Sequence, residues 1–272
     1  MTEETLVSVV IPAYQAEATL ARALESVLAQ SWHNLQVIVV DDGSRDGTLA
    51  VAREAAKRDD RVQVLTQANA GVSAARNLGL AACRGTWVCF VDADDTLPAD
   101  SVAIRVRQAS RNRSQLVIGG YTEYVGPATR FKNLAKREAT LSFEEILPEL
   151  SLHANSYFYG VLWNKLFARS VVEKTGAAFG REFTWGEDFA FVMDYLQGVD
   201  RVAYMKESVY DYRRNPESAT IRQVLDSVVH PLGNIRTKRQ LYGHLKALYV
   251  ARGAFPAYRH RLWHYLFRVG LS

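Results

Sequence analysis

The chain contains 272 residues, of which 48% are hydrophobic and 23% are charged, and its formal net charge is +4. This length and apolar content predict a globular protein with a full core, built as one large domain with an appended part. The positive charge favours anionic partners such as nucleotides, lipid head groups or nucleic acid, and it does not choose among them.

The cysteines and the hydropathy of the chain indicate in which cellular compartment the protein is found. Cys83 and Cys89 match neither a zinc knuckle nor a disulfide framework, so we expect buried, reduced thiols. Residues 1–6 lack the basic and apolar regions of a signal peptide, and no apolar run approaches the roughly 18 residues that span a membrane. We therefore expect a cytoplasmic protein without a membrane-spanning segment.

The first half alternates buried strands with amphipathic helices. Residues 6–11 form an apolar, β-branched run ended by Pro12, a helix follows from about Ala18, and residues 35–40 form a second buried strand. The same patterns predict helices at 48–57, 72–82 and 98–110, and strands at 61–66, 86–91 and 116–119. This alternation favours right-handed βαβ units, and hence an α/β fold whose mainly parallel sheet is covered by helices on both faces.

Ligands of such sheets bind beyond the carboxyl ends of the strands, where residues 12–14, 41–44, 69–71 and 92–95 form loops. In an extended chain Asp92 and Asp94 point the same way, and the small residue between them leaves room for a ligand. Two neighbouring carboxylates repel each other, and a divalent metal with phosphate oxygens in its shell relieves the repulsion. The alternative is a capped loop, in which Asp95 or Thr96 starts a helix that Pro98 opens.

The other loops offer groups that suit a nucleotide. Neither G-x-G-x-x-G nor G-x-x-x-x-G-K-[ST] follows the first strand, which counts against dinucleotide oxidoreductases and P-loop enzymes. Asp41 can accept a hydrogen bond from a base N–H, Tyr14 offers a ring for stacking, and Arg76 can contact a phosphate or a base carbonyl. Equally, Asp41 can belong to a turn, Tyr14 can pack, and Arg76 can pair with an acid.

Four motifs stand in order across the first hundred residues: Val-Val-Ile-Pro-Ala-Tyr (9–14), Val-Asp-Asp-Gly-Ser-Arg-Asp-Gly-Thr (40–48), Asn-Ala-Gly-Val-Ser-Ala-Ala-Arg-Asn (69–77) and Val-Asp-Ala-Asp-Asp (91–95). Together they closely resemble family 2 glycosyltransferases. The resemblance implies a GT-A fold, a nucleoside-diphosphate-sugar donor, a divalent metal and inversion at the anomeric carbon.

Carried over residue by residue, the resemblance assigns roles at this surface. Asp41 looks like the acid that reads uracil, and Tyr14, in the same loop as Pro12, looks like the ring that stacks on the base. Arg76 resembles the basic residue beside the nucleotide. The resemblance further implies that Asp92 binds the ribose and Asp94 the metal, Mn²⁺ or Mg²⁺.

Beyond Tyr124 the pattern changes. Gly126, Pro127 and the basic residues of 130–137 predict an exposed connection, and Ser142-Phe-Glu-Glu145 fits a capping box that begins a short helix. Residues 157–167 are rich in aromatic side chains, most of which we expect to pack. Within them Trp163, Asn164 and Lys165 fit the Trp-Asn-Lys-Leu segment of the family, which implies an acceptor or phosphate contact.

Gly186-Glu187-Asp188-Phe189 precedes a helix with an inward apolar face. Glu187 and Asp188 are favoured first-turn carboxylates, and by themselves predict only helix stabilisation of about 0.3–1 kcal/mol. The family resemblance instead implies that this segment supplies the catalytic base, for which we take Asp188 with Glu187 as rival. Tyr212 and Arg213 likewise fit the Tyr-x-Tyr-Arg segment that closes over the donor phosphates.

The residues from 224 onward predict helices with breaks at Gly253 and Pro256, and they mix aromatic with basic side chains. This composition suits contact with anionic lipid, and it equally suits packing on the enzyme or on a second subunit of a homo-oligomer. No nucleic-acid-binding module is recognisable. We expect a nucleotide-sugar-binding core at 1–125, an acceptor-side lobe with the base at 126–222, and a helical tail at 223–272.

The sequence is interpreted as an inverting, metal-dependent hexosyl- or hexosaminyltransferase that uses a UDP-sugar. Its expected acceptor is a glycan or glycolipid, such as a lipid-linked or cell-surface polysaccharide precursor, reached at the inner face of the membrane. The first alternative is a non-catalytic nucleotide-sugar or glycan-binding protein on the same fold. The presence of the acids at 92, 94 and 188 counts against this alternative. The second is a nucleotidyltransferase, which normally carries a basic, glycine-rich phosphate loop.

Overall fold

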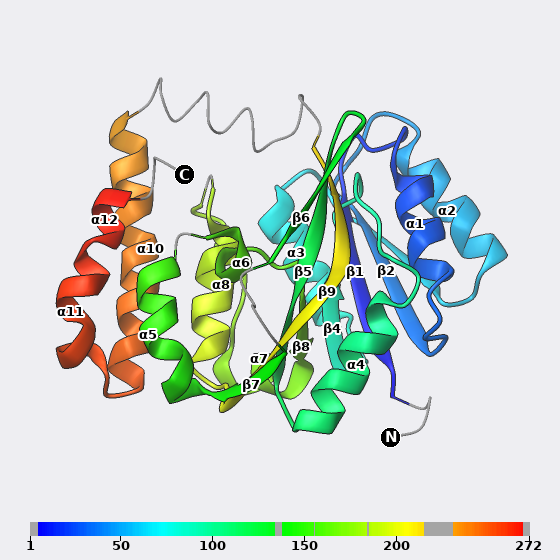
Figure 1. Cartoon of the computed structure of the whole chain (residues 1–272). Helices are drawn as coiled ribbons and strands as arrows, with labels where there is room; N and C mark the ends of the chain where they lie inside the picture. The colour runs from blue at the N-terminus through cyan, green and yellow to red at the C-terminus, as the bar shows by residue number, and fades with distance from the viewer. Residues whose placement is uncertain (1–4, 134–137, 155, 184, 215–230, 269–272) are drawn as a thin grey trace.

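The computed structural model describes residues 5–133, 138–154, 156–183, 185–214 and 231–268. A twisted sheet stands between helices α1 and α2 on one side and a helical layer of α5, α8, α10 and α11 on the other (Figure 1). The elements in chain order are β1 (Val7–Ala13), α1 (Leu20–Leu28), β2 (Leu35–Asp41), α2 (Thr48–Arg58), β3 (Val62–Thr66), α3 (Val72–Ala81), β4 (Trp87–Phe90), α4 (Ser101–Asn112), β5 (Leu116–Val125), β6 (Ala128–Lys132), β7 (Ala139–Ser142), α5 (Phe143–His153), α6 (Tyr157–Gly160), β8 (Lys165–Ala168), α7 (Arg169–Thr175), α8 (Glu187–Leu196), β9 (Arg201–Arg213), α10 (Pro231–Ala251), α11 (Phe255–Trp263) and α12 (Tyr265–Arg268).

Among the described residues nine strands form one sheet in the order β3-β2-β1-β4-β8-β5-β9-β7, with β6 paired to β5. The strands β3, β2, β1 and β4 are parallel, as predicted. The far half is mixed, because β8 pairs antiparallel with both β4 and β5 while β9 runs parallel to β5. The predicted α/β fold is confirmed, and its first four strands bring their carboxyl ends to one edge.

Burial explains why β1 and β2 lie at the centre of the parallel half. Every residue of both strands is buried, which fits their unbroken apolar sequences and the helices on either face. On one face α3 approaches β1 so closely that a Cβ at Gly79 would collide with Val10. The helix that carries Arg76 therefore lies directly on the central strand.

One prediction about local structure was wrong. The helix after the acidic loop begins at Ser101, not at Pro98, and neither Asp95 nor Thr96 caps it. Thr96 instead pairs with Asp211 of β9 through two backbone hydrogen bonds of 3.3 and 3.0 Å. Residues 128–132 are exposed, as predicted, and they form the hairpin strand β6, which the sequence had not indicated.

Other predictions for the second half are confirmed. Ser142 caps α5: the Glu145 N–H donates to Ser142 Oγ at 3.3 Å, and the Ser142 N–H donates to Glu145 Oε2 at 2.7 Å. The aromatic stretch packs the interior, with these rings buried: Phe158, Tyr159, Trp163 and Phe167.

The described part of the tail packs on the enzyme itself. The Tyr249 hydroxyl of α10 donates to the Leu147 carbonyl of α5 at 2.7 Å, and His244 meets Asp194 of α8 at 2.8 Å. The chain breaks at Gly253 as predicted, whereas Pro256 stands in the first turn of α11. No helix of the described residues is long and apolar enough to cross a membrane.

The three predicted segments share one framework. The sheet combines β1 to β5 of the first segment with β6 to β9 of the second, and helix α10 of the third packs against α8. The predicted boundary at 222 lies outside the described residues, so the division into domains stays a prediction.

Candidate active site

Arg76 joins three carboxylates from distant parts of the chain. Its Nη2 lies 3.1 Å from Asp92 Oδ1, at the end of β4, and its Nη1 lies 3.0 Å from Glu187 Oε1 and 2.7 Å from Asp188 Oδ1, at the start of α8. The Arg76 side chain is only 6% exposed. Two of the predicted nucleotide-binding residues, Arg76 and Asp92, therefore meet both candidates for the catalytic base.

The single positive charge of Arg76 does not neutralise three carboxylates, and this charge imbalance affects the pKa of Asp188. Burial raises the pKa of Asp188, Arg76 opposes the rise, and Glu187 and Asp92 add to it. Burial alone would lower the pKa of Arg76, but the attraction of its three acidic partners outweighs burial, and the pKa is raised above its ordinary value. Arg76 therefore stays charged, while Asp188 is a carboxylate with increased affinity for a proton.

Glycine sets the position of the two acids on α8. Gly186 has φ of +83°, a left-handed conformation that lets the chain turn into the helix. A Cβ at this position would lie 2.6 Å from Leu241 Cδ1 of α10. The start of α8 is thus held against α10, and it presents Glu187 and Asp188 to Arg76.

The three acids after β4 have different surroundings. Burial and then Asp92 raise the pKa of Asp94 to about 6 although Arg22 acts in the opposite direction, and no Lys or Arg in the described ranges lies within ion-pair distance of the Asp94 carboxylate. Its backbone carbonyl accepts a hydrogen bond from Arg22 Nη2 at 2.8 Å. Asp95 is 1% exposed and is bonded internally to Tyr210 and Arg213.

This donor set fits a divalent cation bound together with a ligand. No group of three or more His, Cys, Asp or Glu side chains in the described part of the chain could hold a metal by itself. Asp94 and Asp92 offer carboxylate oxygens, of which Asp92 Oδ1 is already paired with Arg76 at 3.1 Å. Metals such as Mg²⁺ commonly bind through one or two carboxylates and take their other ligands from phosphate and water.

The expected nucleotide side forms around the ends of β1 and β2. Tyr14 is 51% exposed, so its ring is available for stacking, whereas Pro12 is buried in β1. Asp41 is buried at the end of β2, and its Oδ1 accepts from the Ser44 N–H at 3.4 Å.

The sequence alone indicated no role for Asp42, which stabilises the loop next to the end of β2. Its carboxylate accepts hydrogen bonds from the N–H groups of Ala70 and Gly71, both at 2.8 Å, and from Gln67 Nε2 at 2.7 Å. It thereby fixes the loop that precedes α3 and Arg76. The sequence feature that could have indicated this role is the pair Asp41-Asp42, in which Asp42 has a structural role.

The loop after β1 is also held by the loop after β2. The Gln15 N–H donates to Ser44 Oγ at 3.1 Å, and Gln15 Oε1 accepts from the Arg45 N–H at 2.7 Å. The Glu17 N–H donates to Asp46 Oδ2 at 3.1 Å. Tyr14 is thus displayed from a supported loop.

Of the residues predicted to contact acceptor or phosphate, Trp163, Asn164 and Lys165 are buried, whereas Tyr212 and Arg213 are half-buried. Trp163 is buried with its ring stacked on Tyr210 and Tyr212, at 4.6 and 5.6 Å between centroids. The Arg213 guanidinium lies 4.9 Å from the centre of the Tyr124 ring. A ligand contact for these side chains stays a prediction.

Asn164 and Lys165 are fully buried next to each other. Lys165 Nζ donates to the carbonyls of Phe158 and Val161 at 2.7 and 2.6 Å, and to Asn164 Oδ1 at 2.8 Å. Burial lowers the pKa of Lys165, and Asp188 acts in the opposite direction. Three acceptors around one nitrogen require three N–H donors, so the contacts favour a protonated ammonium group beside the site.

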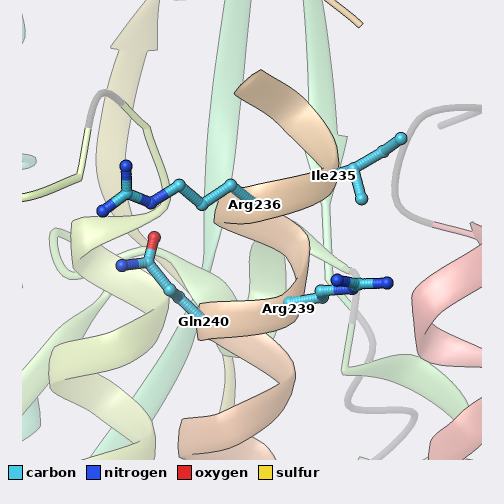
Figure 2. Close-up of a pocket in the computed structure, with 4 residues that line it drawn as sticks. All are labelled: Ile235, Arg236, Arg239 and Gln240. Carbon is cyan, nitrogen blue, oxygen red and sulfur yellow. The ribbon is translucent and has the colours of Figure 1, made fainter. Parts of the chain in front are cut away.

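A basic hollow of about 400 Å³ lies on α10 (Figure 2). Arg236 and Gln240 extend to one side of the helix and Ile235 and Arg239 to the other. The next residue, Leu241, is the one that meets Gly186. The hollow is therefore close to the start of α8.

Comparison with known proteins decides the family. The family described as "Glycosyl transferase family 2" matches residues 8–176, which is more than half of the chain. The chain belongs to this family. The family 2 assignment agrees with the motifs that end β1, β2 and β4, and the chain is therefore a glycosyltransferase.

Individual relatives extend the family 2 match along the chain. The glycosyltransferase EpsJ of Bacillus subtilis is 30% identical over 251 residues, which cover 92% of this chain and 69% of EpsJ. The succinoglycan biosynthesis protein ExoO of Rhizobium meliloti is 29% identical over 211 residues, covering 76% of this chain and 60% of ExoO. Family membership thus rests on both halves of the molecule.

A solved structure confirms the fold. S. aureus TarS 1–349, crystallised in complex with UDP-GlcNAc, is similar with a TM-score of 0.69 at 17% sequence identity, and the likeness covers 95% of this chain and 91% of that one. At this identity the comparison shows the GT-A fold alone.

Proposed function

We propose that this glycosyltransferase moves a hexosyl or hexosaminyl group from a UDP-sugar to a hydroxyl of a glycan acceptor, with inversion at the anomeric carbon. One observation carries the proposal. Arg76 contacts Asp92 at the carboxyl end of β4 and Asp188 at the start of α8, so a nucleotide-side acid and a basic carboxylate border the same space.

Uridine is the base that the nucleotide side suits best. Asp41 would accept the N–H of uracil, the exposed Tyr14 ring would stack on the base beside Pro12, and Asp92 would bind the ribose. Arg76 would contact the nucleotide from the side of α3. The UDP-GlcNAc complex of TarS, which shares the fold, supports this choice of donor.

Asp188 would act as general base in a single displacement. The acceptor oxygen attacks C1 of the sugar as its proton passes to Asp188, and the bond from C1 to the diphosphate oxygen breaks to release UDP. Attack opposite the leaving group inverts C1. Burial raises the pKa of Asp188, which brings its basicity closer to what proton removal near neutral pH requires.

Asp94, with Asp92, would hold Mn²⁺ or Mg²⁺. The ion would supply positive charge to the diphosphate as it departs. The raised pKa of Asp94 and the absence of an ion-pair partner for it among the described residues support a cation here.

The proposed acceptor is a polysaccharide precursor or a glycolipid at the inner face of a membrane. The name of ExoO, which makes it a protein of succinoglycan biosynthesis, supports a polysaccharide. The basic hollow at Arg236 and Arg239, close to the start of α8, would suit an acceptor that carries negative charge (Figure 2). Exposed Trp263 and Arg259 on α11 would contact anionic lipid.

A screen of UDP-sugars for UDP release, with Mn²⁺ and with chelator, tests the proposed function. We expect at least one UDP-sugar to release UDP in a metal-dependent way, and calorimetry to show that Asp94→Asn weakens UDP binding, because an amide cannot balance the charge of a metal diphosphate. Unchanged UDP affinity in Asp94→Asn, with and without chelator, would contradict the metal assignment. No release from any UDP-sugar would favour a non-catalytic binding protein.

A further inference from the structure

Asp95 is the third acid of the turn after β4, yet its carboxylate is committed to the protein. It is 1% exposed, and its Oδ2 accepts from the Tyr210 hydroxyl at 2.8 Å while its Oδ1 accepts from the Arg213 N–H at 2.7 Å. Both oxygens thus bind the end of β9. An acid used in this way fixes backbone and is not available as a ligand for a cation.

The Tyr210 hydroxyl completes the contact on the other side of the turn. It accepts a hydrogen bond from the Asp92 N–H at 3.0 Å while it donates to Asp95. The ring of Tyr210 is fully buried and stacks on Trp163 at 4.6 Å, with 18° between the ring planes. Packing therefore sets the position of the ring, and the hydroxyl holds both ends of the acidic turn.

The turn contains the carboxylates of Asp92 and Asp94, whose positions it fixes. The Asp95 N–H donates to the Asp92 carbonyl at 3.1 Å, so the chain bends between them and places Asp92 and Asp94 near each other. The two carboxylates stand two residues apart in this turn, and like charges so close together repel each other. Without a restraint such a turn would relax, and a cation would have to order it on binding.

We propose that Tyr210 and Asp95 are positioning residues that hold the turn 92–95 ready for a metal-bound diphosphate, and that Asp95 is not itself a ligand. The inference rests on the proposed function, because it concerns the same metal and donor. Preorganisation lowers the ordering cost of binding, so the two residues should affect the metal-dependent part of UDP affinity.

Tyr210→Phe isolates the hydrogen bonds, because it keeps the ring on Trp163 and removes the hydroxyl. The buried Asp95 oxygen and the Asp92 N–H then lose a partner. Measured by calorimetry with UDP and MnCl₂, the affinity should fall roughly tenfold or more. With UDP and chelator, wild type and Tyr210→Phe should bind alike. Tyr210→Phe combined with Asp95→Asn should lose little more than Tyr210→Phe alone, because the two side chains act as one unit.

Tyr204→Phe is the matched control on the same strand. Tyr204 is also buried, and its hydroxyl meets that of Tyr159 at 3.3 Å, away from the turn. Its UDP affinity should equal that of wild type. An equal loss in Tyr204→Phe, or a loss in Tyr210→Phe of the same size with chelator, would overturn the inference.

Asp94→Asn, measured alongside, separates this inference from the proposed function. If Asp94→Asn weakens metal-dependent UDP binding and Tyr210→Phe does not, the positioning role is refuted and the metal assignment stands. If wild type binds UDP equally with and without metal, the metal assignment fails and the inference fails with it.

Discussion

Arg76 has one guanidinium for three carboxylates, and this imbalance defines the chemistry of the site. Its Nη1 serves both Glu187 and Asp188, and its Nη2 serves Asp92. The residue therefore holds the proposed base while it also limits how far burial raises the pKa of that base. A neutral side chain at this position would remove both effects.

Arg76→Met should shift the pH dependence of the reaction. Asp188 must be ionised to accept a proton, so kcat/KM falls as the pH drops through its pKa. Loss of the cation that opposes burial raises this pKa, so the acid limb should move to higher pH, by roughly 1–3 units. Initial rates between pH 5 and 9 test this expectation.

Arg58→Met is the control for this substitution. Arg58 pairs with Glu54 on the exposed face of α2, so its loss should leave the pH profile unchanged. An acid limb that stays in place in Arg76→Met would show that Arg76 does not face the base during turnover.

At single residues, the sequence predicted positions better than roles. Hydropathy placed Asp41 and Asp92 at strand ends, and the family resemblance singled out Asp188, which the structure joins to Asp92 through Arg76. They could not show that Asp42 and Asp95 serve the backbone, because such roles depend on partners more than 20 residues away in sequence. Whether a ligand contacts the buried Trp163 and Lys165 stays a prediction for the same reason.

Among the elements, α8 depends on the glycine at its N-cap. Gly186 combines a left-handed φ with contact to Leu241 on α10, and the next two residues are Glu187 and Asp188. A side chain here would strain the backbone and push α8 away from α10. The position of the proposed base is thus linked to the packing of two helices.

Gly186→Ala should lower both stability and turnover. The left-handed conformation alone costs about 1–2 kcal/mol for a residue with a Cβ, and the approach to Leu241 adds to it. Gly176→Ala is the control, because Gly176 has φ of +67° and no atom within 4 Å of an added Cβ. It should lose stability without loss of turnover. Equal turnover in the two variants, measured with urea unfolding, would contradict the link.

The strands of the second half were the least predictable elements. β8 is only four residues long and was expected as part of an aromatic stretch, but it enters the sheet antiparallel between β4 and β5. Its place is set by pairing with distant strands, which local periodicity does not encode. The parallel half was predictable because each strand there is a continuous apolar run.

At the scale of the whole molecule, the tail is part of the enzyme's packing. Leu262 is fully buried and Tyr265 stacks on Phe189 at 5.3 Å, so removal of the residues after Pro256 would open the interior. Membrane contact is therefore tested better by substitution of exposed side chains than by truncation.

Trp263→Ser with Arg259→Gln should reduce flotation of the protein with phosphatidylglycerol vesicles at low salt. Trp263 is 60% exposed, and an aromatic ring with a nearby cation favours an anionic interface. Phe131→Ser, at the equally exposed Phe131 of β6, is the control and should float like wild type. If wild type itself fails to float, the outer face of α11 is not a membrane contact.

Asp188→Asn, measured with Glu187→Gln beside it, tests whether Asp188 removes a proton during sugar transfer. The amide keeps the size of the side chain but cannot accept the proton, so turnover with the UDP-sugar found in the screen should fall by roughly 10²–10⁴-fold while UDP affinity holds. A role limited to the helix start would instead cost a fraction of a kcal/mol in stability and leave the rate nearly intact. Normal turnover in Asp188→Asn would show that Asp188 is not the base, and a collapse confined to Glu187→Gln would assign the base to Glu187.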